Sequence, residues 1–296
     1  MNVSMQDSYN LGWKLASVIK GVASPDILRT YHEERLPVAK RLIEFDKRIC
    51  RGMLGSEHTF DDDHRQALAE ENTSMSGLGI AYQPNMVMAD EVKEPFMNGN
   101  SHLPKQPQPD SMKAIELGAR IPSELVLSQS DSQPYHLQRL FQSTGEWNLL
   151  IFGGNIENQD QKQRVERLAA TLSRPSSIIQ KLRHRRRSRN DPVGSISVYL
   201  IHSADRTRVN LWDLPEIFRL PDEDTGIDYG KVFVDNESYH VGGGKAYQEF
   251  GIPAQGRLVL LRPDQHVSFI GGLEDCDHLE HFLGLANAGA LDLTGA

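Results

Sequence analysis

A β-hairpin is indicated by the stretch Gly256-Arg-Leu-Val-Leu-Leu-Arg-Pro-Asp-Gln-His-Val-Ser-Phe-Ile270. Its apolar runs, Arg257 to Leu261 and His266 to Ile270, have the length and composition of buried strands. Between them, Arg262-Pro-Asp264 predicts a tight turn, because Pro fixes φ and the Asp side chain bonds nearby backbone N–H groups. A lone turn carboxylate is expected to stabilise the turn, so Asp264 is not predicted to be catalytic.

Strands and helices alternate on both sides of this hairpin. Strands are predicted at Trp147 to Phe152, Ser195 to Ile201 and Lys231 to Val234, and helices at Val165 to Leu172, Gly244 to Phe250 and Cys276 to Leu285. Their order along the chain is β-α-β, then α, then β-β-α, which is the order of a thioredoxin-like α/β fold. We therefore expect a four-stranded sheet between helices.

The first fifty residues show a helical pattern. Apolar residues repeat on one face at Leu11, Leu15, Val18 and Ile19, and Gly21 supplies a C-terminal stop. A second helix is predicted to begin with Ser24 as N-cap and Pro25 at the first helical position, and Pro37 is expected to bend or restart it.

A segment rich in proline and turn formers, Glu94 to Asp110, separates these helices from the α/β pattern. The predicted organisation is a helical segment over 1–60, a linker over 61–112 and a thioredoxin-like domain over 113–296. The basic run Lys181 to Arg189 is predicted to be a mobile surface loop, because like charges of this density repel one another.

Composition excludes several classes of protein. The net charge of −8 argues against a nucleic-acid-binding protein, since such proteins are usually basic. No apolar run approaches the length of a membrane span. The two cysteines, Cys50 and Cys276, form no disulfide framework, and His278 with His281 lacks a third ligand, so no metal site is predicted. Gly242-Gly-Gly-Lys245 lacks the spacing of a phosphate loop and predicts a flexible turn.

Three segments resemble one family of enzymes. Met1-Asn-Val-Ser-Met-Gln-Asp-Ser-Tyr-Asn-Leu-Gly-Trp-Lys-Leu-Ala16 resembles the second flavin fingerprint of aromatic hydroxylases. Tyr31-His-Glu-Glu-Arg-Leu-Pro-Val38 matches the Tyr-x-x-Glu-Arg-x-Pro signature of the same enzymes. Tyr247-x-x-Phe-Gly-Ile252 followed by Gly256 to Asp264 resembles their thioredoxin-like tail domain. The chain is thus similar to the C-terminal part of phenol 2-monooxygenase-type, FAD-dependent aromatic hydroxylases.

The resemblance implies a flavin-dependent monooxygenase that hydroxylates phenolic compounds with FAD, NADPH and dioxygen. It places Met1, Asn2 and Val3 beside the flavin, where unpaired N–H groups of a helix N-terminus favour a polar or anionic cofactor edge. It identifies no catalytic residue. Glu34 and Arg35 are expected to pair with neighbouring helices rather than to touch substrate. Because the family's Gly-Gln-Gly precedes the match, the isolated chain is expected to be an inactive fragment that does not hold FAD.

The alternative is a non-catalytic, redox-inert, thioredoxin-like module for dimerisation or interaction. Thiol exchange needs an activated cysteine at the start of a helix, usually in C-x-x-C, but Gly153-Gly-Asn-Ile156 stands at the expected place. Cys276 lies in the last predicted helix. Under both interpretations we expect a homodimer in the cytoplasm, with neither a nucleic-acid nor a membrane partner.

Overall fold

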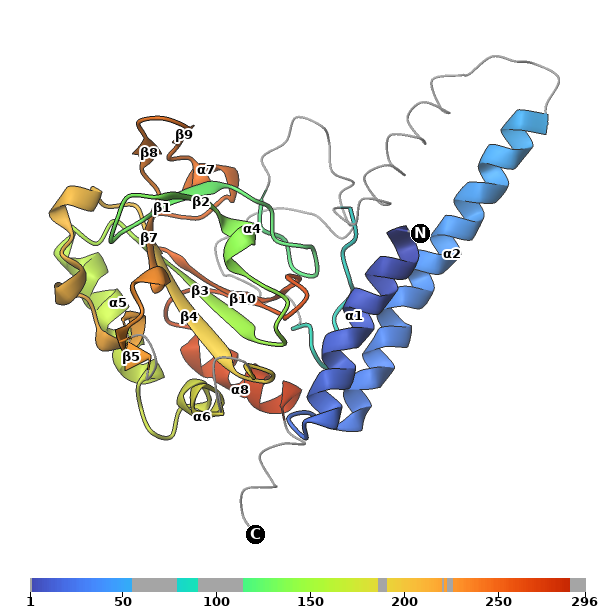
Figure 1. The fold of residues 1–296 in the computed structure, drawn as a ribbon, viewed down its shortest axis with the longest axis horizontal. Helices are drawn as coiled ribbons and strands as arrows, with labels where there is room; N and C mark the ends of the chain where they lie inside the picture. The colour runs from blue at the N-terminus through green and yellow to red at the C-terminus, as the bar shows by residue number, and fades with distance from the viewer. Residues whose placement is uncertain are drawn as a thin grey trace, which may run out of the picture.

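The computed structural model describes residues 2–54, 79–89, 114–185, 191–219, 221–222 and 226–287. It consists of a helical hairpin at one side and a mixed sheet flanked by helices at the other (Figure 1). Among the described residues, none of the helices combines the length and the apolar character that crossing a membrane requires. The helical N-terminal segment and the α/β domain that the sequence predicts are both confirmed.

The hairpin consists of α1 (Asn2–Ile19) and α2 (Arg29–Leu54), joined by a short 3₁₀ turn, η1 (Pro25–Leu28). Gly21 takes a φ of +69°, a conformation that favours glycine and ends α1. The Ser24 side chain accepts a hydrogen bond from the Asp26 N–H and caps η1. The expected restart at Pro37 is wrong, because α2 continues through this residue, which lies on the exposed side of the helix.

The main sheet has seven strands in the order β11-β10-β3-β4-β7-β1-β2. The strands are β1 (Leu125–Ser128), β2 (Pro134–His136), β3 (Trp147–Gly154), β4 (Ile196–His202), β7 (Val232–Val234), β10 (Arg257–Leu261) and β11 (Val267–Gly271). β3, β4 and β7 are parallel, whereas β10 is antiparallel to β3. The β11-β10-β3-β4 part has the thioredoxin-like order. The expectation of four strands is wrong, because β7 and the β1–β2 hairpin extend the sheet beyond β4.

Helices cover both faces of the sheet, so β3 is buried along its whole length. Trp147, Leu149 and Ile151 face one core, which includes α5 (Gln159–Leu172), α6 (Ile178–His184) and α8 (Cys276–Ala286). Leu150 and Phe152 face a second core, with α4 (Leu137–Leu140) and α7 (Ala246–Glu249). The two-residue period of the strand thus divides its apolar residues between two layers.

Shorter elements complete the description. They are η2 (Arg206–Arg208), η3 (Leu211–Asp213), η4 (Glu216–Phe218), η5 (Tyr229–Lys231), β5 (Pro221–Asp222), β6 (Gly226–Ile227), β8 (Glu237–Ser238) and β9 (Gly242–Gly243). The glycine run over 242–244 lies at the β8–β9 hairpin, where all three residues have positive φ. In sequence, the elements from η2 to η5 lie between β4 and β7, and β8 and β9 lie between β7 and β10.

The basic run is helical where the structure describes it, which corrects the predicted loop. Lys181 lies within α6, whose residues Ile178, Ile179 and Leu182 are buried against the sheet. Apolar spacing on one face of this short helix outweighs the repulsion between its charges. The rest of the run, from residue 186 to Arg189, lies outside the described residues.

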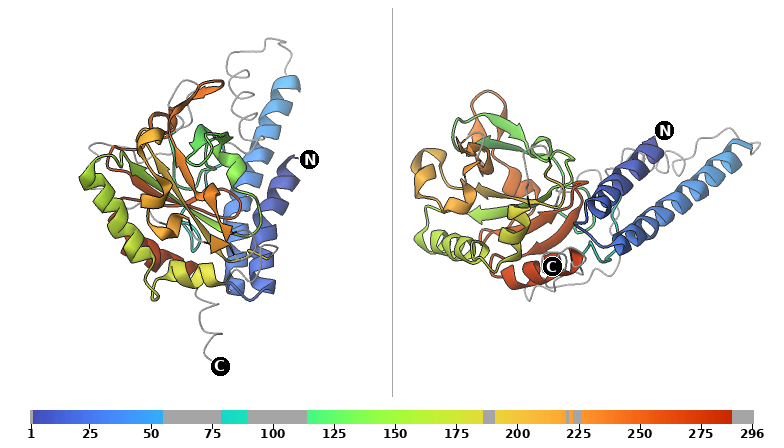
Figure 2. Two further views of the ribbon diagram at one scale, coloured as in Figure 1. Left: turned by 60° about the vertical axis from the view of Figure 1, so that its left-hand side comes forward. Right: turned by 60° about the horizontal axis from the view of Figure 1, so that its bottom comes forward.

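The helical hairpin packs directly on the sheet domain, and the three views agree on this (Figures 1 and 2). The Trp13 ring meets the Trp147 ring edge-on, with centroids 5.9 Å apart, and Ile27 joins the same core. Residues 79–89 also bind the sheet domain, since the Ala89 N–H donates to the Ser268 carbonyl at 2.9 Å. The proposed domain boundaries at 60 and 112 stay a prediction.

Gly256 is a position where the backbone needs glycine. Its φ is +84°, and a Cβ placed there would lie 2.2 Å from the Phe152 carbonyl oxygen of β3. We expect Gly256→Ala to lower the free energy of unfolding by about 3 kcal/mol, because both the left-handed backbone and the clash with a central strand are penalised. Urea unfolding at neutral pH measures this.

Gly242→Ala is the matched control. Gly242 has a similar φ of +73°, but nothing lies within 4 Å of the position that a Cβ would take there. Its cost should be about 1 kcal/mol, the steric penalty of the left-handed backbone alone. Equal losses in the two variants would contradict the role assigned to the contact with Phe152.

Candidate functional site: a buried charge cluster between the hairpin and the sheet

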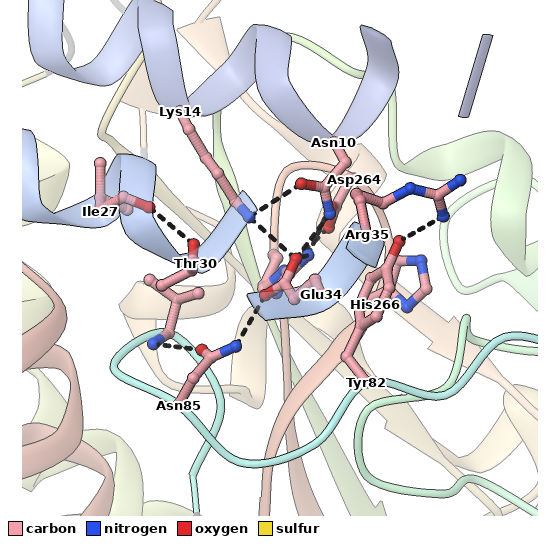
Figure 3. A network of polar contacts seen from close by, with 12 residues as sticks. Asn10, Lys14, Ile27, Thr30, Glu34, Arg35, Tyr82, Asn85, Asp264 and His266 are labelled. Carbon is pink, nitrogen blue, oxygen red and sulfur yellow. Dashed lines mark hydrogen bonds and ion pairs between the residues drawn. The ribbon is translucent and has the colours of Figure 1, made fainter. Parts of the chain in front are cut away.

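Four charged side chains meet where the helical hairpin contacts the sheet domain (Figure 3). Lys14 comes from α1, Glu34 from α2, and Arg262 and Asp264 from the turn between β10 and β11. Each of these side chains is at most 1% exposed. Two cations and two anions are therefore buried together, and their charges balance.

Arg262 is the centre of this charge cluster. Its Nη1 and Nη2 donate to the two oxygens of Glu34 at 2.6 and 3.1 Å. Its Nε and Nη2 also donate to the two oxygens of Asp264 at 3.0 and 2.6 Å. Bonds through two nitrogens at a time fix the direction of the guanidinium plane as well as its position.

Glu34 accepts hydrogen bonds from three further donors. Lys14 Nζ lies 2.8 Å and Asn10 Nδ2 lies 2.6 Å from Oε2, and both side chains reach down from α1 (Figure 3). Asn85 Nδ2 donates to Oε1 at 2.9 Å from the segment over 79–89. One carboxylate thus ties together both helices, this segment and the β10–β11 turn.

Aromatic rings enclose the guanidinium. The carbon of the Arg262 guanidinium lies 5.5 Å from the Trp13 ring centroid and 5.3 Å from the Tyr82 ring centroid. The Trp13 indole N–H also donates to Asp264 Oδ2 at 3.1 Å. Tyr82 stacks on His266 with centroids 4.4 Å apart. These contacts exclude water and strengthen the electrostatic interactions inside.

The pKa values follow from burial and charge. Burial raises the pKa of Glu34, but the charges of Arg262 and Lys14 more than offset this and lower it to about 2. Burial also acts to raise the pKa of Asp264, yet Arg262 holds it well below its ordinary value. Burial, with repulsion from Arg262, lowers the pKa of Lys14 to about 8. Near neutral pH both carboxylates are therefore ionised.

His266 stays neutral near pH 7, because burial lowers its pKa to about 4. Its Nδ1 lies 2.8 Å from the Gly118 carbonyl, which can only accept, so Nδ1 carries the proton. The imidazole is therefore a fixed structural donor rather than an available base.

A second ion pair joins the two helices beside the cluster. Arg35 Nε donates to Asp7 Oδ1 of α1 at 2.6 Å, and Arg35 Nη1 donates to the Tyr82 hydroxyl at 3.2 Å. The predicted pairing of Glu34 and Arg35 with a neighbouring helix is confirmed. The view of Asp264 as a lone turn carboxylate is wrong, since Arg262 and Trp13 both bind it.

Lys14, Asn10 and Asn85 were not predicted as site residues. The spacing of Asn10 and Lys14 by four residues places both on one face of α1, and this face is buried together with Trp13 and Ser17. Asn85 lies in the predicted linker and gave no periodic signal.

The expectation that Leu11, Leu15, Val18 and Ile19 mark the buried face is wrong, because Leu15 is 39% and Ile19 is 80% exposed. The mainly polar face of α1 is the buried one, because its side chains bind Glu34.

A small pocket lies beside the cluster, with a volume of about 30 Å³. Its wall includes Tyr9 and Asn10 of α1, together with Arg120, Asp264 and His266. A space of this size holds about one or two water molecules and is too small for an aromatic substrate. The arrangement can thus hold α1 in place.

The residues predicted to contact a flavin lie at the start of α1. Met1 lies outside the described residues, and Asn2 and Val3 are the first two residues of the helix. The first turn contains no acidic side chain, and Met5 in the second turn is 57% exposed. The positive end of the helix dipole there would suit an anionic or polar cofactor edge. The chemistry of this helix start fits a flavin, and contact of Met1, Asn2 and Val3 with one stays a prediction.

The corner between β3 and α5 is filled by a tyrosine. The Gly154 N–H donates to the Tyr247 hydroxyl at 2.8 Å, and this hydroxyl donates to the Ile201 carbonyl at 2.7 Å.

Cys276 is buried at the start of α8, where burial raises the pKa of its thiol to about 12. A protonated thiol is a poor nucleophile. Within the described ranges, no group of three metal-binding side chains occurs.

Loss of the Glu34 charge should be costly. Glu34→Gln leaves Arg262 and Lys14 buried with one carboxylate, so we expect a loss of about 3 to 5 kcal/mol in the free energy of unfolding. The neighbouring Glu33 is exposed, and Glu33→Gln should change stability by less than about 0.5 kcal/mol. Urea titrations of both variants test this, and similar effects would show that Arg262 and Lys14 do not depend on the Glu34 carboxylate.

The Glu34 carboxylate should also make the free energy of unfolding depend on pH. The folded-state pKa of Glu34, about 2, is below the ordinary 4.5, so its contribution is complete above pH 4.5 and is lost as pH falls toward 2. Between about pH 6 and pH 3.5, wild type should lose about 1.5 kcal/mol more than Glu34→Gln. Parallel pH dependences of the two proteins would contradict an ionised Glu34.

Two regions of the chain match known protein families. Residues 80–287 match the family described as phenol hydroxylase, C-terminal dimerisation domain, and residues 1–46 match an FAD binding domain. The buried cluster joins the two matched regions, since Lys14 and Glu34 lie in one and Arg262 and Asp264 lie in the other.

Two curated relatives resemble nearly the whole chain. An FAD-dependent monooxygenase (ankC) of Aspergillus thermomutatus is 34% identical over 96% of this chain and 43% of its own length. A phenol 2-monooxygenase (fsqG) of Aspergillus fumigatus is 32% identical over 95% of this chain and 44% of its own length. The chain thus spans less than half the length of these relatives.

Among solved structures, the flavin-dependent monooxygenase PieE, in complex with FAD and substrate, resembles this structure with a TM-score of 0.54. The two are 17% identical, and the match covers 97% of this chain and 44% of PieE, so this likeness supports the fold. The family match covers most of the chain. The chain therefore belongs to the phenol hydroxylase family, of which it carries the C-terminal dimerisation domain.

Proposed function

We propose that these 296 residues form the C-terminal part of an FAD-dependent monooxygenase that hydroxylates phenolic compounds. The observation that carries this proposal is the buried charge cluster, which links the region matching an FAD-binding domain to the dimerisation domain. A link built from buried ionic bonds supports a joint role for the two regions. The curated relatives that match both regions are named as monooxygenases.

FAD, when bound, supplies the redox chemistry of the reaction with dioxygen, and NADPH is the proposed reductant. We propose that Met1, Asn2 and Val3 lie beside it, with backbone N–H groups at the start of α1 directed at a polar edge of the cofactor. Lys14 and Asn10 act at a distance from that edge. They hold α1 on Glu34, so that the start of the helix keeps a fixed position.

The dimerisation domain is proposed to join two copies of the chain in a homodimer. A phenolic substrate is proposed from the name of the relative in Aspergillus fumigatus. A cytoplasmic location is consistent with the free thiols of Cys50 and Cys276.

The second candidate function, a redox-inert interaction module, is favoured by the protonated Cys276 and by the filled β3–α5 corner.

A hybrid enzyme separates the two candidates. In it, the 296 residues replace the corresponding C-terminal part of the phenol 2-monooxygenase of Aspergillus fumigatus. We expect the purified hybrid to be yellow, with about one FAD per chain, and to oxidise NADPH in a phenol-dependent manner. The reason is that the start of α1 would complete the flavin site while the cluster holds the helix in place.

The 296-residue chain alone is the control and should bind FAD more weakly than micromolar. A micromolar complex needs about 8 kcal/mol, whereas each charge-assisted hydrogen bond contributes about 1.5 to 3 kcal/mol. A hybrid that folds, as judged by circular dichroism, but lacks flavin would favour the interaction module. Absorbance at flavin wavelengths and cofactor release by heat provide the measurement.

A further inference from the structure

Two aromatic side chains on the sheet domain are exposed although they contact each other. Trp212 of η3 is 54% exposed and Tyr229 of η5 is 45% exposed. Their rings meet edge-on with centroids 6.5 Å apart. Two separate segments of the chain thus bring large apolar side chains together at the surface instead of in a core. Tryptophan and tyrosine are enriched at protein interfaces relative to the rest of the surface.

The two rings line a hollow of about 380 Å³ on the surface of the domain. Its wall also contains polar side chains, among them Gln129, Ser130 and Arg206. Tryptophan, tyrosine and arginine are the residues that most often dominate the binding energy of protein interfaces. We refer to Trp212, Tyr229 and this wall as the aromatic hollow.

Hydrogen bonds fix the loop that carries Trp212. Buried Gln129 donates from Nε2 to the carbonyls of Arg206 and Val209, at 3.0 and 2.7 Å. Its Oε1 lies 3.0 Å from Nε2 of His202, a residue that is fully buried at the end of β4. Because the Gln129 amide donates elsewhere, its oxygen accepts from His202. The loop is thus anchored to two strands of the sheet.

Trp212 itself is also held in place. Its backbone N–H donates to Asn210 Oδ1 at 3.1 Å, and the Arg219 guanidinium lies 5.2 Å from the centroid of its indole ring. Arg219 Nη2 donates to the Trp212 carbonyl at 3.3 Å. A side chain that is already ordered loses little conformational entropy on binding, so it can contribute most of its contact energy.

The aromatic hollow lies away from the helical hairpin. The segment over 206–219, yellow to orange in Figure 1, lies at the end of the sheet domain that is far from α1 and α2, and both views of Figure 2 agree. A partner bound there leaves the start of α1 uncovered.

We propose that the aromatic hollow is the centre of the contact between two copies of this chain, related by a twofold axis. This inference rests on the proposed homodimer and adds the surface that forms it. The region 80–287, which contains Trp212 and Tyr229, is matched as a dimerisation domain. A second copy is therefore the occupant that we assign to the hollow, whose aromatic lining and anchored loop suit a protein contact.

Sedimentation equilibrium of the full 296-residue chain tests the proposal. Wild type should show twice the monomer mass of 33.3 kDa at micromolar concentration. Trp212→Ala and Tyr229→Ala should each raise the dimer dissociation constant about 30-fold or more, as expected for residues central to an interface. Tyr239→Ala is the matched control, because Tyr239 is 96% exposed on the β8–β9 hairpin, and it should leave the constant unchanged.

Tryptophan fluorescence gives a second readout that needs no variant. Trp13 and Trp147 are 5% and 3% exposed, so acrylamide should quench Trp212 selectively. Dilution through the dissociation range should increase quenching as Trp212 becomes accessible. Unfolding curves of the variants exclude loss of the fold as the cause of dissociation.

Three outcomes would overturn the proposal. A Trp212→Ala protein that dimerises as tightly as wild type, with quenching independent of concentration, would place the contact elsewhere. A wild type that stays monomeric at all concentrations would remove the dimer itself. Protection of Trp212 by added phenol without a change in mass would identify a small-molecule site instead. None of these results alters the FAD content of the hybrid enzyme, which tests the proposed function separately.

Discussion

The guanidinium of Arg262 sets the strictest constraint on this structure. It is fully buried, and transfer of a charge from water into protein is tolerated only when opposite charge and hydrogen-bond partners are supplied. Asp264, two residues away on the same turn, supplies one carboxylate, and Glu34 of α2 supplies the other. The sheet domain alone therefore leaves Arg262 half satisfied, and the helical hairpin completes its surroundings.

A buried charge network contributes more to geometry than to stability. Desolvation offsets much of the attraction, so an apolar contact of similar volume could stabilise the junction as well. Directional bonds do what apolar packing does not, because they accept one orientation of Glu34 and, through Lys14 and Asn10, one position of α1. Trp13 adds the apolar part of the junction and a hydrogen bond to Asp264. This precision is useful if the start of α1 must meet a cofactor.

The sequence predicted the elements whose signals are local. The β10–β11 hairpin, β3 and α8 have clear apolar runs or periods, and their bounds lie within about two residues of those predicted. The extra strands β1 and β2 were missed, because four- and three-residue segments at a sheet edge carry little periodic signal. α6 was missed because its charges dominate a seven-residue helix. The cluster could be predicted only in part, since the partner of Glu34 lies 228 residues away in sequence.

The thioredoxin-like fold serves here as a scaffold, and the reason lies at the carboxyl ends of its parallel strands. This edge is where open α/β sheets usually bind ligands. At the end of β3, however, the Tyr247 hydroxyl occupies the corner by bonding both Gly154 and Ile201. Asp235 fixes this tyrosine in turn, because its carboxylate accepts the backbone N–H groups of Ala246 and Tyr247 at the start of α7. The corner is therefore filled by protein, and fold alone assigns no chemistry to it. What the domain offers instead is two surfaces: the Arg262 turn, which binds the helices, and the loops beyond β4, which are free to bind a partner.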